Sequence, residues 1–339
     1  MKATKMEKIS IIVPFHNPPL AQFRLCLESL AGQLYDNFEV ILVDDGSEDE
    51  SYKYIVAEYK SKFSGLQIIK QEHQGVGVAR NNGIQASAGN FIAFCDCDDY
   101  LSNNYLYSLN KAIKDVDLAI CGVAEQSYPT INSLVDMHIF SSLPSVYNYV
   151  QYVNFSVNKL YKKKIIDDNH IVFDESIKLG EDAIFLARYL SKCGRIRTIE
   201  DELYHYLPNI YSAVHTYYPE YWIWESKVIR VQMELFEEYP LNGEEQQFMQ
   251  YWLFNKIRGI VNYYVDKGHI NEVPLQQKKF LSVISNSDIF KKLMENTDYK
   301  DNIFMTAKDK KLLWIWCNLG LNYGVKIKKY WKIAAHLLH

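Results

Sequence analysis

Apolar and polar positions alternate in blocks along the first 125 residues. Short runs rich in β-branched residues, stopped by proline, glycine or aspartate, predict buried strands. These runs are Ile9–Val13, Phe38–Val43, Leu66–Ile69, Phe91–Phe94 and Asp117–Cys121. Between them, apolar residues three and four apart predict helices, at Leu20–Leu34, Ser51–Phe63 and Val76–Ser87. Such alternation predicts an α/β fold, with a mainly parallel sheet covered by helices on both faces.

Beyond residue 125 the pattern changes twice. Residues 126–218 are mixed, with a predicted helix at Ala183–Leu190 and a predicted strand at Ile196–Ile199. From about Tyr218 the spacing becomes helical and aromatic, as in Trp222–Tyr239 and Phe248–Tyr264. We therefore predict one α/β domain over residues 1–218, made of halves 1–125 and 126–218, and a helical C-terminal region over residues 219–339.

Composition narrows the classes of protein. The 339 residues are more than one ordinary domain needs, and the formal net charge of −4 gives no sign of a nucleic-acid partner. The 6 cysteines have no zinc-site spacing, so we expect reduced thiols and a cytoplasmic location. The apolar run Ile11–Val13 is too short for a signal peptide, and no run of about 18 apolar residues predicts a spanning helix.

Polar side chains follow three of the predicted strands. The pairs His16–Asn17 and Asp44–Asp45 and the acidic run Asp96–Asp99 stand at these positions. In sheets of this type ligands bind beyond the carboxyl ends of the strands, so three clusters at one edge predict a ligand site. The alternative is ordinary loop chemistry.

Carboxylates at two of these strand ends suggest particular ligands. Residues two apart in an extended chain point to one side, so Asp96 and Asp98 can address one Mn²⁺ or Mg²⁺ ion. The alternative is a solvated acidic loop that caps the next helix. Asp45 can accept hydrogen bonds from a base or a ribose, while Gly46 and Ser47 suit a turn and a helix N-cap.

These motifs together resemble the family-2 glycosyltransferases, which have the GT-A fold, a Rossmann-like sheet. The resemblance covers residues 1–125 strongly, because five motifs occur in order and at the family's spacing. They are Ile12–Asn17, Leu25–Gln33, Val43–Ser47, Gly75–Gly83 and Asp96–Asp99, the last at the position of the family's metal-binding DxD motif. The segments Asn158–Lys162 and Gly180–Asp182 extend it to about residue 215.

The resemblance implies a metal-dependent, inverting transfer of a hexose. The donor would be a UDP-sugar, the metal Mn²⁺ or Mg²⁺, and the acceptor a hydroxyl on a glycan, glycoprotein or lipid-linked saccharide. Residues 1–125 would bind the nucleotide sugar and residues 126–218 the acceptor. Asp98 and Asp96 would hold the metal, with Asp96 also touching the donor, and the implied donor contacts are Pro14, Phe15, His16, Asn17 and Asp45. For His16 the alternative is that it simply closes the loop.

The resemblance also implies the base. Inversion needs one group to take the proton of the acceptor hydroxyl, and Asp182 has that position, with Glu181 orienting it. A plain helix start with acids in its first turn is the alternative. Arg80 would pair with the acidic motifs or the diphosphate, or form a surface ion pair. The arginine often found in the family's later basic segment is absent, so His205 or His215 would replace it.

Two other functions remain open at this point. A nucleotidyltransferase also uses metal and acidic loops, but Pro14–Pro19 carries no lysine or arginine for a phosphate loop. A non-catalytic nucleotide-sugar-binding module is disfavoured by intact Asp96, Asp98 and Asp182.

Separately, the basic and aromatic segment Lys310–His339 suggests peripheral membrane contact, and a helix packed on the rest of the chain explains it equally well.

Overall fold

The chain divides into two compact units, which are described one at a time. In the computed structural model the described residues are 7–124, 133–136, 154–209, 215–237, 243–269, 271–273, 275–276 and 279. The first unit comprises Met1–Phe140 and Val150–Ala213, and the second comprises Ser141–Tyr149 and Val214–His339. The predicted domain boundary near Tyr218 stays a prediction.

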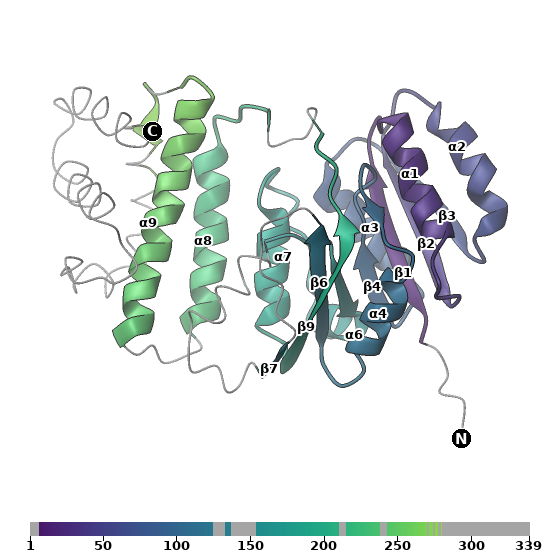
Figure 1. Ribbon diagram of the computed structural model, residues 1–339. Helices are drawn as coiled ribbons and strands as arrows, with labels where there is room; N and C mark the ends of the chain where they lie inside the picture. The colour runs from purple at the N-terminus through teal and green to yellow at the C-terminus, as the bar shows by residue number, and fades with distance from the viewer. Residues whose placement is uncertain are drawn as a thin grey trace. The chain divides into compact units, whose positions relative to one another are not determined.

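One nine-stranded sheet runs through the described part of the first unit (Figure 1). Its strands are β1 (Ile9–Phe15), β2 (Phe38–Asp45), β3 (Leu66–Gln71), β4 (Phe91–Phe94), β5 (Tyr100–Leu101), β6 (Leu118–Ala124), β7 (Ser133–Asp136), β8 (Lys159–Lys162) and β9 (Arg195–His205). They lie in the order β3-β2-β1-β4-β8-β6-β9-β5, and β7 pairs with β9. All five strands predicted for residues 1–125 are present, as is the strand predicted at Ile196–Ile199.

The sheet is mainly parallel, as predicted, with three short strands that run antiparallel to their neighbours. β3, β2, β1 and β4 are parallel, as are β6 and β9. β8 runs antiparallel between β4 and β6, and β5 and β7 run antiparallel to β9. The three antiparallel strands have two to four residues each. Such short strands carry too few positions for an alternating pattern to be visible in the sequence.

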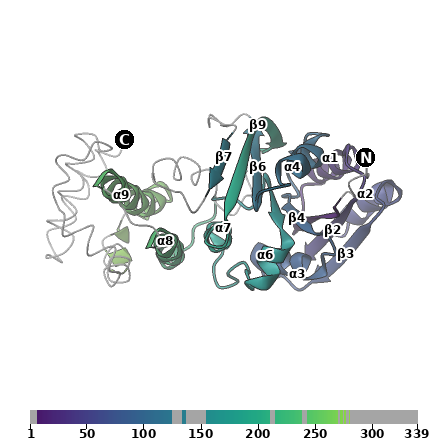
Figure 2. The same ribbon diagram turned by 90° about the horizontal axis from the view of Figure 1, so that it is seen from below.

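Helices cover both faces of the sheet, as predicted. Figure 2 shows α1 and α4 on one face and α3, α6 and α7 on the other. The bounds are α1 (Leu20–Ala31), α2 (Tyr52–Tyr59) with a 3₁₀ turn at Lys60–Lys62, α3 (Val76–Ala86), α4 (Tyr105–Ala112), α6 (Lys163–Asp168) and α7 (Glu181–Leu190). α1 ends three residues before the predicted Leu34, because Gly32, a weak helix former, stands at its C-cap.

Close packing fixes α3 and α7 against the strands that carry the polar motifs. A Cβ atom added to Gly83 of α3 would lie 2.4 Å from Cγ2 of Ile12 in β1, so only glycine allows this approach. Phe185 of α7 stacks on Phe173 with centroids 4.1 Å apart and meets Phe94 of β4 at 5.8 Å. These contacts place the start of α7 beside the end of β4.

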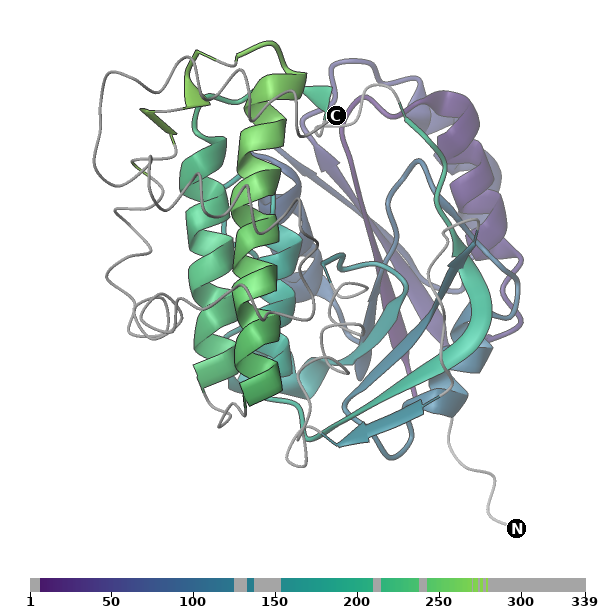
Figure 3. The same cartoon turned by 60° about the vertical axis from the view of Figure 1, so that its left-hand side comes forward.

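The second unit contains α8 (Tyr221–Glu237) and α9 (Gly243–Asp266) among its described residues. The two helices lie side by side (Figures 1 and 3), and Nζ of Lys256 contacts Oε1 of Glu225 at 2.9 Å. Both predicted C-terminal helices are therefore present.

In the part of the chain that the structure describes, no helix is long and apolar enough to cross a membrane. The segment Lys310–His339 lies outside the described residues.

Candidate active site

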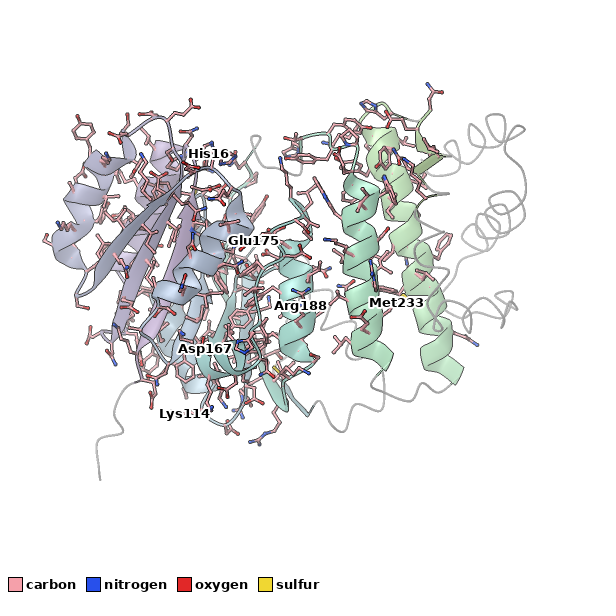
Figure 4. The ribbon with its side chains drawn as sticks, turned by 180° about the vertical axis from the view of Figure 1, so that it is seen from behind. His16, Lys114, Asp167, Glu175, Arg188 and Met233 are labelled. Carbon is pink, nitrogen blue, oxygen red and sulfur yellow. The ribbon has the colours of Figure 1, made fainter. Side chains whose placement is uncertain are left out.

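The loops after β1, β2 and β3 are bonded to one another at the carboxyl edge of the sheet. Nδ1 of His16 contacts the carbonyl oxygen of Asp45 at 2.9 Å. Asn17, at φ 42°, accepts hydrogen bonds from the backbone N–H groups of Glu48 and Asp49. In Figure 4, His16 lies at one end of the first unit, while Lys114 and Asp167 lie at the opposite end. The convergence predicted for His16–Asn17 and Asp44–Asp45 is therefore present.

Asp45 has a nearly fully bonded carboxylate. Oδ1 accepts from Nε2 of Gln71 and from the N–H of Gln74, each at 2.8 Å. Oδ2 accepts from the N–H of Gly75 at 2.9 Å and contacts Nδ1 of His73 at 2.9 Å. Four donors match the number that a carboxylate ordinarily accepts. Asp45 thus organises the loop that leads into α3, and its contact with a base stays a prediction.

The strand ends that carry these loops are buried and well packed. Phe15 is 3% exposed and packs against Phe23 and Tyr52, with centroids 5.1 Å and 4.8 Å away. Asp44 accepts hydrogen bonds from the N–H of Ser47 and the hydroxyl of Tyr52, each at 2.7 Å. Pro14 is also buried. The predicted contacts of Pro14 and Phe15 with a nucleotide stay predictions.

Arg80 joins the two acidic motifs. Its NH1 contacts Oε1 of Glu181 at 3.0 Å and Oδ1 of Asp182 at 2.7 Å, and its NH2 contacts Oδ1 of Asp96 at 2.9 Å. The guanidinium side chain is only 4% exposed, so these pairs are shielded from water. Arg80 is therefore not the exposed ion pair that the sequence left open, and it brings Asp96 and Asp182 to one place.

Asp182 belongs to the first turn of α7, so the helix-start alternative also holds. The residue before the helix, Gly180, has φ 92°, a value that favours glycine. Oδ2 of Asp182 accepts from the N–H of Ser156 at 3.2 Å. Burial raises the pKa of Asp182 and of Glu181, and the guanidinium of Arg80 opposes that rise.

The acidic run after β4 has two kinds of carboxylate. Asp99 is buried, and its oxygens accept from the hydroxyl of Tyr204 at 2.5 Å and the N–H of Leu207 at 2.9 Å. Asp98 is half-buried, and its Oδ2 accepts from Nδ2 of Asn209 at 2.7 Å. Burial is the main reason that the pKa of Asp98 and of Asp99 is raised. The segment after β9 therefore lies on the acidic motif.

The acidic run offers two carboxylates, and not three or more, to a divalent metal. Within the described residues, no group of three or more His, Cys, Asp or Glu side chains is arranged to hold a metal ion. Asp96 and Asp98 are partly exposed, with Oδ1 of Asp96 held by Arg80 and Oδ2 of Asp98 held by Asn209. Mg²⁺ commonly takes only one or two protein carboxylates beside substrate phosphates, so two such ligands fit.

His205 and His215, the two candidates for the role of the absent arginine, belong to different units of the chain. His205 stacks on Tyr100 with centroids 4.3 Å apart, and its Nε2 meets Oγ of Ser102 at 2.8 Å. His215 belongs to the second unit, where its carbonyl accepts from Nζ of Lys267. Their predicted role near phosphates stays a prediction.

Sequence reasoning missed several residues that shape the site. They are His73, Ser156, Tyr204 and Asn209. Their partners lie far away in the chain, and only Tyr204 and Asn209 fall in the later basic segment, residues 204–215, that the resemblance points to.

The cysteines fit the prediction of reduced thiols. The five cysteines of the described residues are free, and the closest pair, Cys26 and Cys95, has its sulfur atoms 3.8 Å apart. Cys317 lies outside the described residues.

Comparison with known proteins agrees with this fold. The profile of Glycosyl transferase family 2 matches residues 10–174. EpsH of Bacillus subtilis (strain 168), which is named as a glycosyltransferase, is 34% identical over 221 residues, covering 62% of this chain and 63% of EpsH. The poly(ribitol-phosphate) beta-N-acetylglucosaminyltransferase TarS of Staphylococcus aureus (strain Mu50) is 31% identical over 209 residues, covering 59% of this chain and 35% of TarS. The chain thus spans less than two thirds of either relative.

A solved structure extends the likeness to the fold. The crystal structure of S. aureus TarS 1–349 in complex with UDP-GlcNAc has a TM-score of 0.71 at 24% identity, covering 92% of this chain and 88% of that one. The first unit thus has the GT-A fold. Residues 10–174, a little under half of the chain, are thus similar to glycosyl transferase family 2.

Proposed function

We propose that this chain is a metal-dependent, inverting hexosyltransferase. It transfers a hexose from a UDP-sugar to a hydroxyl of a glycan, a glycoprotein or a lipid-linked saccharide. The observation that carries the proposal is the cluster around Arg80, in which Asp96 of the acidic motif and Asp182 of α7 meet one guanidinium. A transfer needs a group for the leaving diphosphate beside a group for the attacking hydroxyl, and this cluster supplies both.

The choice of donor rests on the family and on the loops after β1, β2 and β3. A relative of the same fold, TarS, has been crystallised with UDP-GlcNAc. Here hydrogen bonds join the loops that carry His16, Asn17 and Asp45. These loops lie at the carboxyl edge of the sheet, where nucleotides bind in such folds. We therefore propose a UDP-sugar as the donor, with Asp45 as the contact for the base in exchange for one of the four partners that its carboxylate has here.

Asp182 acts as the base in the proposed reaction. As the acceptor oxygen forms its bond to the anomeric carbon, Asp182 takes the hydroxyl proton. The bond from that carbon to the diphosphate oxygen breaks on the opposite face, and UDP leaves with the electron pair. The anomeric configuration is inverted. A raised pKa makes Asp182 a better proton acceptor, and Glu181 shares Arg80 with it.

Asp96 and Asp98 would hold Mn²⁺ or Mg²⁺. When bound, the ion neutralises negative charge on the leaving diphosphate. The charges of the site support this proposal, because Arg80 faces Asp96, Glu181 and Asp182, and Asp98 adds a further carboxylate. Arg80 keeps Asp96 in place through Oδ1 and leaves Oδ2 available.

The test is release of UDP from a panel of UDP-sugars, measured with and without acceptors and with and without EDTA. Poly(ribitol-phosphate) belongs in the acceptor panel, because TarS is named for it. Metal-dependent UDP release that rises with one acceptor supports the proposal. A nucleotidyltransferase would transfer UMP and release the sugar 1-phosphate instead, and a binding module would release nothing. Either result with all donors would overturn the proposal.

We also propose a cytoplasmic enzyme with peripheral membrane contact through Lys310–His339. The support is compositional, since that segment combines tryptophans with lysines. Sedimentation with anionic vesicles tests it: the full chain should pellet with them at low salt, and equal recovery in the supernatant with or without vesicles would contradict it.

A further inference from the structure

We infer that Lys159 is a positioning residue for Asp182. Together with Asn158 and Tyr161, it fixes residues 155–158 so that the backbone N–H of Ser156 meets the carboxylate of Asp182. The inference rests on the proposed role of Asp182 as the base. It gives a function to the motif Asn158–Lys162, which the proposed reaction has not otherwise used.

The two oxygens of Asp182 are held by different parts of the chain. Arg80 contacts Oδ1 at 2.7 Å, and the N–H of Ser156 donates to Oδ2 at 3.2 Å. Donors on both oxygens define the rotation of the carboxylate about its Cβ–Cγ bond. A general base must be aimed at the proton it removes, so the position of Ser156 bears directly on the reaction.

Lys159 ties together the segment that carries Ser156. Its side chain is fully buried, and Nζ donates to the carbonyl oxygens of Phe155 at 2.8 Å and Val157 at 3.1 Å. Nζ also donates to Oδ1 of Asn158 at 2.6 Å. These acceptors lie on either side of Ser156, so one ammonium group closes the segment into a fixed loop.

Asn158 and Tyr161 attach this loop to the sheet. Asn158 has φ 56°, and its Nδ2 donates to the carbonyl of Cys121 in β6 at 2.5 Å. The hydroxyl of Tyr161 in β8 donates to the carbonyl of Ser156 itself at 2.9 Å. Three side chains of one short motif therefore act on the loop that presents a single N–H to Asp182.

Burial of the Lys159 ammonium group is unfavourable in free energy, so its presence here calls for an explanation. Transfer of an ammonium group from water is unfavourable unless hydrogen bonds offset it, and burial lowers the pKa of Lys159 to about 7. An apolar side chain would pack at lower cost but could not gather the oxygens on both sides of Ser156. The arrangement is best explained by the backbone geometry that it enforces.

The experiment compares Lys159→Met and Tyr161→Phe with a matched control, Tyr189→Phe. Tyr189 packs against Tyr161 with centroids 5.0 Å apart, and its buried hydroxyl also donates to a carbonyl, that of Asp117 at 2.7 Å. It has no contact with residues 155–158 among the bonds described. All three proteins are assayed for kcat, for KM of the UDP-sugar and for Tm.

We expect Tyr161→Phe to lower kcat about 3- to 10-fold and Lys159→Met about 10- to 100-fold, since a misplacement of 1 Å can cost about 100-fold. KM for the donor should stay within about twofold, because the base does not touch the nucleotide. Tyr189→Phe should lower Tm as much as Tyr161→Phe while its kcat stays within about twofold. If Lys159→Met does not fold, Tyr161→Phe decides the question.

Two results would overturn the inference. One is a Tyr161→Phe variant whose kcat equals that of Tyr189→Phe. The other is a loss carried entirely by KM. An Asp182→Asn variant separates this failure from a failure of the proposed function: if Asp182→Asn transfers sugar normally, Asp182 is not the base. If it is inactive while Tyr161→Phe and Lys159→Met have normal kcat, only the positioning role is wrong.

Discussion

At the scale of single residues, neighbours in the chain have very different surroundings. Asp98 and Asp99 adjoin, yet Asp98 is half-buried at the rim while Asp99 is buried under Tyr204. The sequence predicted where the acidic run lies, because a buried strand ends immediately before it. It could not separate the two carboxylates, since their partners come from β9 and the segment after it, more than a hundred residues away.

The first prediction concerns the metal. Asp98→Asn should reduce transfer strongly while the fold stays intact, because the change removes a charge from a partly exposed site and keeps the shape of the side chain. Activity of the wild type should vanish in EDTA and return with Mn²⁺ or Mg²⁺. The measurements are steady-state rates and the Tm of both proteins. Full transfer by EDTA-treated enzyme would remove the metal from the mechanism.

Asp99→Asn is the matched comparison for that variant. Asp99 accepts two hydrogen bonds in the interior, so its substitution should lower Tm, whereas Asp98→Asn should not. Equal losses of Tm in the two variants would show that Asp98 is structural as well.

The second prediction concerns Asp182 and Glu181, which share Arg80. Asp182→Asn should lower kcat about 100- to 10,000-fold, the usual cost of a missing general base. Affinity for UDP, measured by calorimetry, should barely change. Glu181→Gln should be milder if Glu181 only orients its neighbour. An active Asp182→Asn beside an inactive Glu181→Gln would exchange the two roles.

At the scale of elements, predictability follows length and burial. The long alternating run from β1 to β4 was predicted nearly residue by residue, because its strands are apolar and stopped by turn residues. Short strands such as β5 and β8, and helices such as α4 and α6, escaped, since two to eight residues carry little periodicity. The missed β8 follows directly on the loop that holds Ser156, so the contact with Asp182 could not have been predicted.

The third prediction concerns the packing of α3 against β1. In Gly83→Ala the new Cβ would lie 2.4 Å from Cγ2 of Ile12, so the helix must move away from the strand. We expect a loss of about 1–3 kcal/mol in the free energy of unfolding. Transfer should fall as well, because α3 carries Arg80. Urea unfolding and kcat measure the two effects.

Gly77→Ala, in the same helix, is the control. Its Cβ would meet Phe173 at 3.5 Å, an ordinary contact. The variant should be as stable as the wild type or more so, because alanine favours a helix by about 1 kcal/mol over glycine. If both variants lose the same stability, the close approach at Gly83 does not set the position of α3.

At the scale of the whole molecule, the polar motifs gather at one edge of the first unit. The sequence predicted this edge from a general property of parallel strands, and Figure 4 shows His16 at that end, opposite Lys114 and Asp167. It could not show how the motifs are joined, because Arg80 and Asp45 act through bonds to residues that are distant in sequence.

The last prediction concerns the dependence of global stability on pH. Asp44 is fully buried, and its carboxylate accepts hydrogen bonds from Ser47 and Tyr52. Burial alone would raise the pKa of Asp44, but these bonds and Lys70 hold it below its ordinary value. A lowered pKa in the folded state adds stability above the ordinary value near pH 4, and that stability is lost as the pH falls through the folded value.

Asp44→Asn should therefore be less stable than the wild type at pH 7, by about 1–3 kcal/mol, because hydrogen bonds to a charged group are lost. The difference should shrink as the pH falls below about 4, where the unfolded wild type takes up a proton before the folded protein does. Urea unfolding of both proteins at several pH values measures it. The exposed Asp36 supplies the control, since Asp36→Asn should change the free energy of unfolding by less than about 0.5 kcal/mol. A difference between wild type and Asp44→Asn that stays constant from pH 7 to pH 3 would mean that the charge of Asp44 does not stabilise the fold.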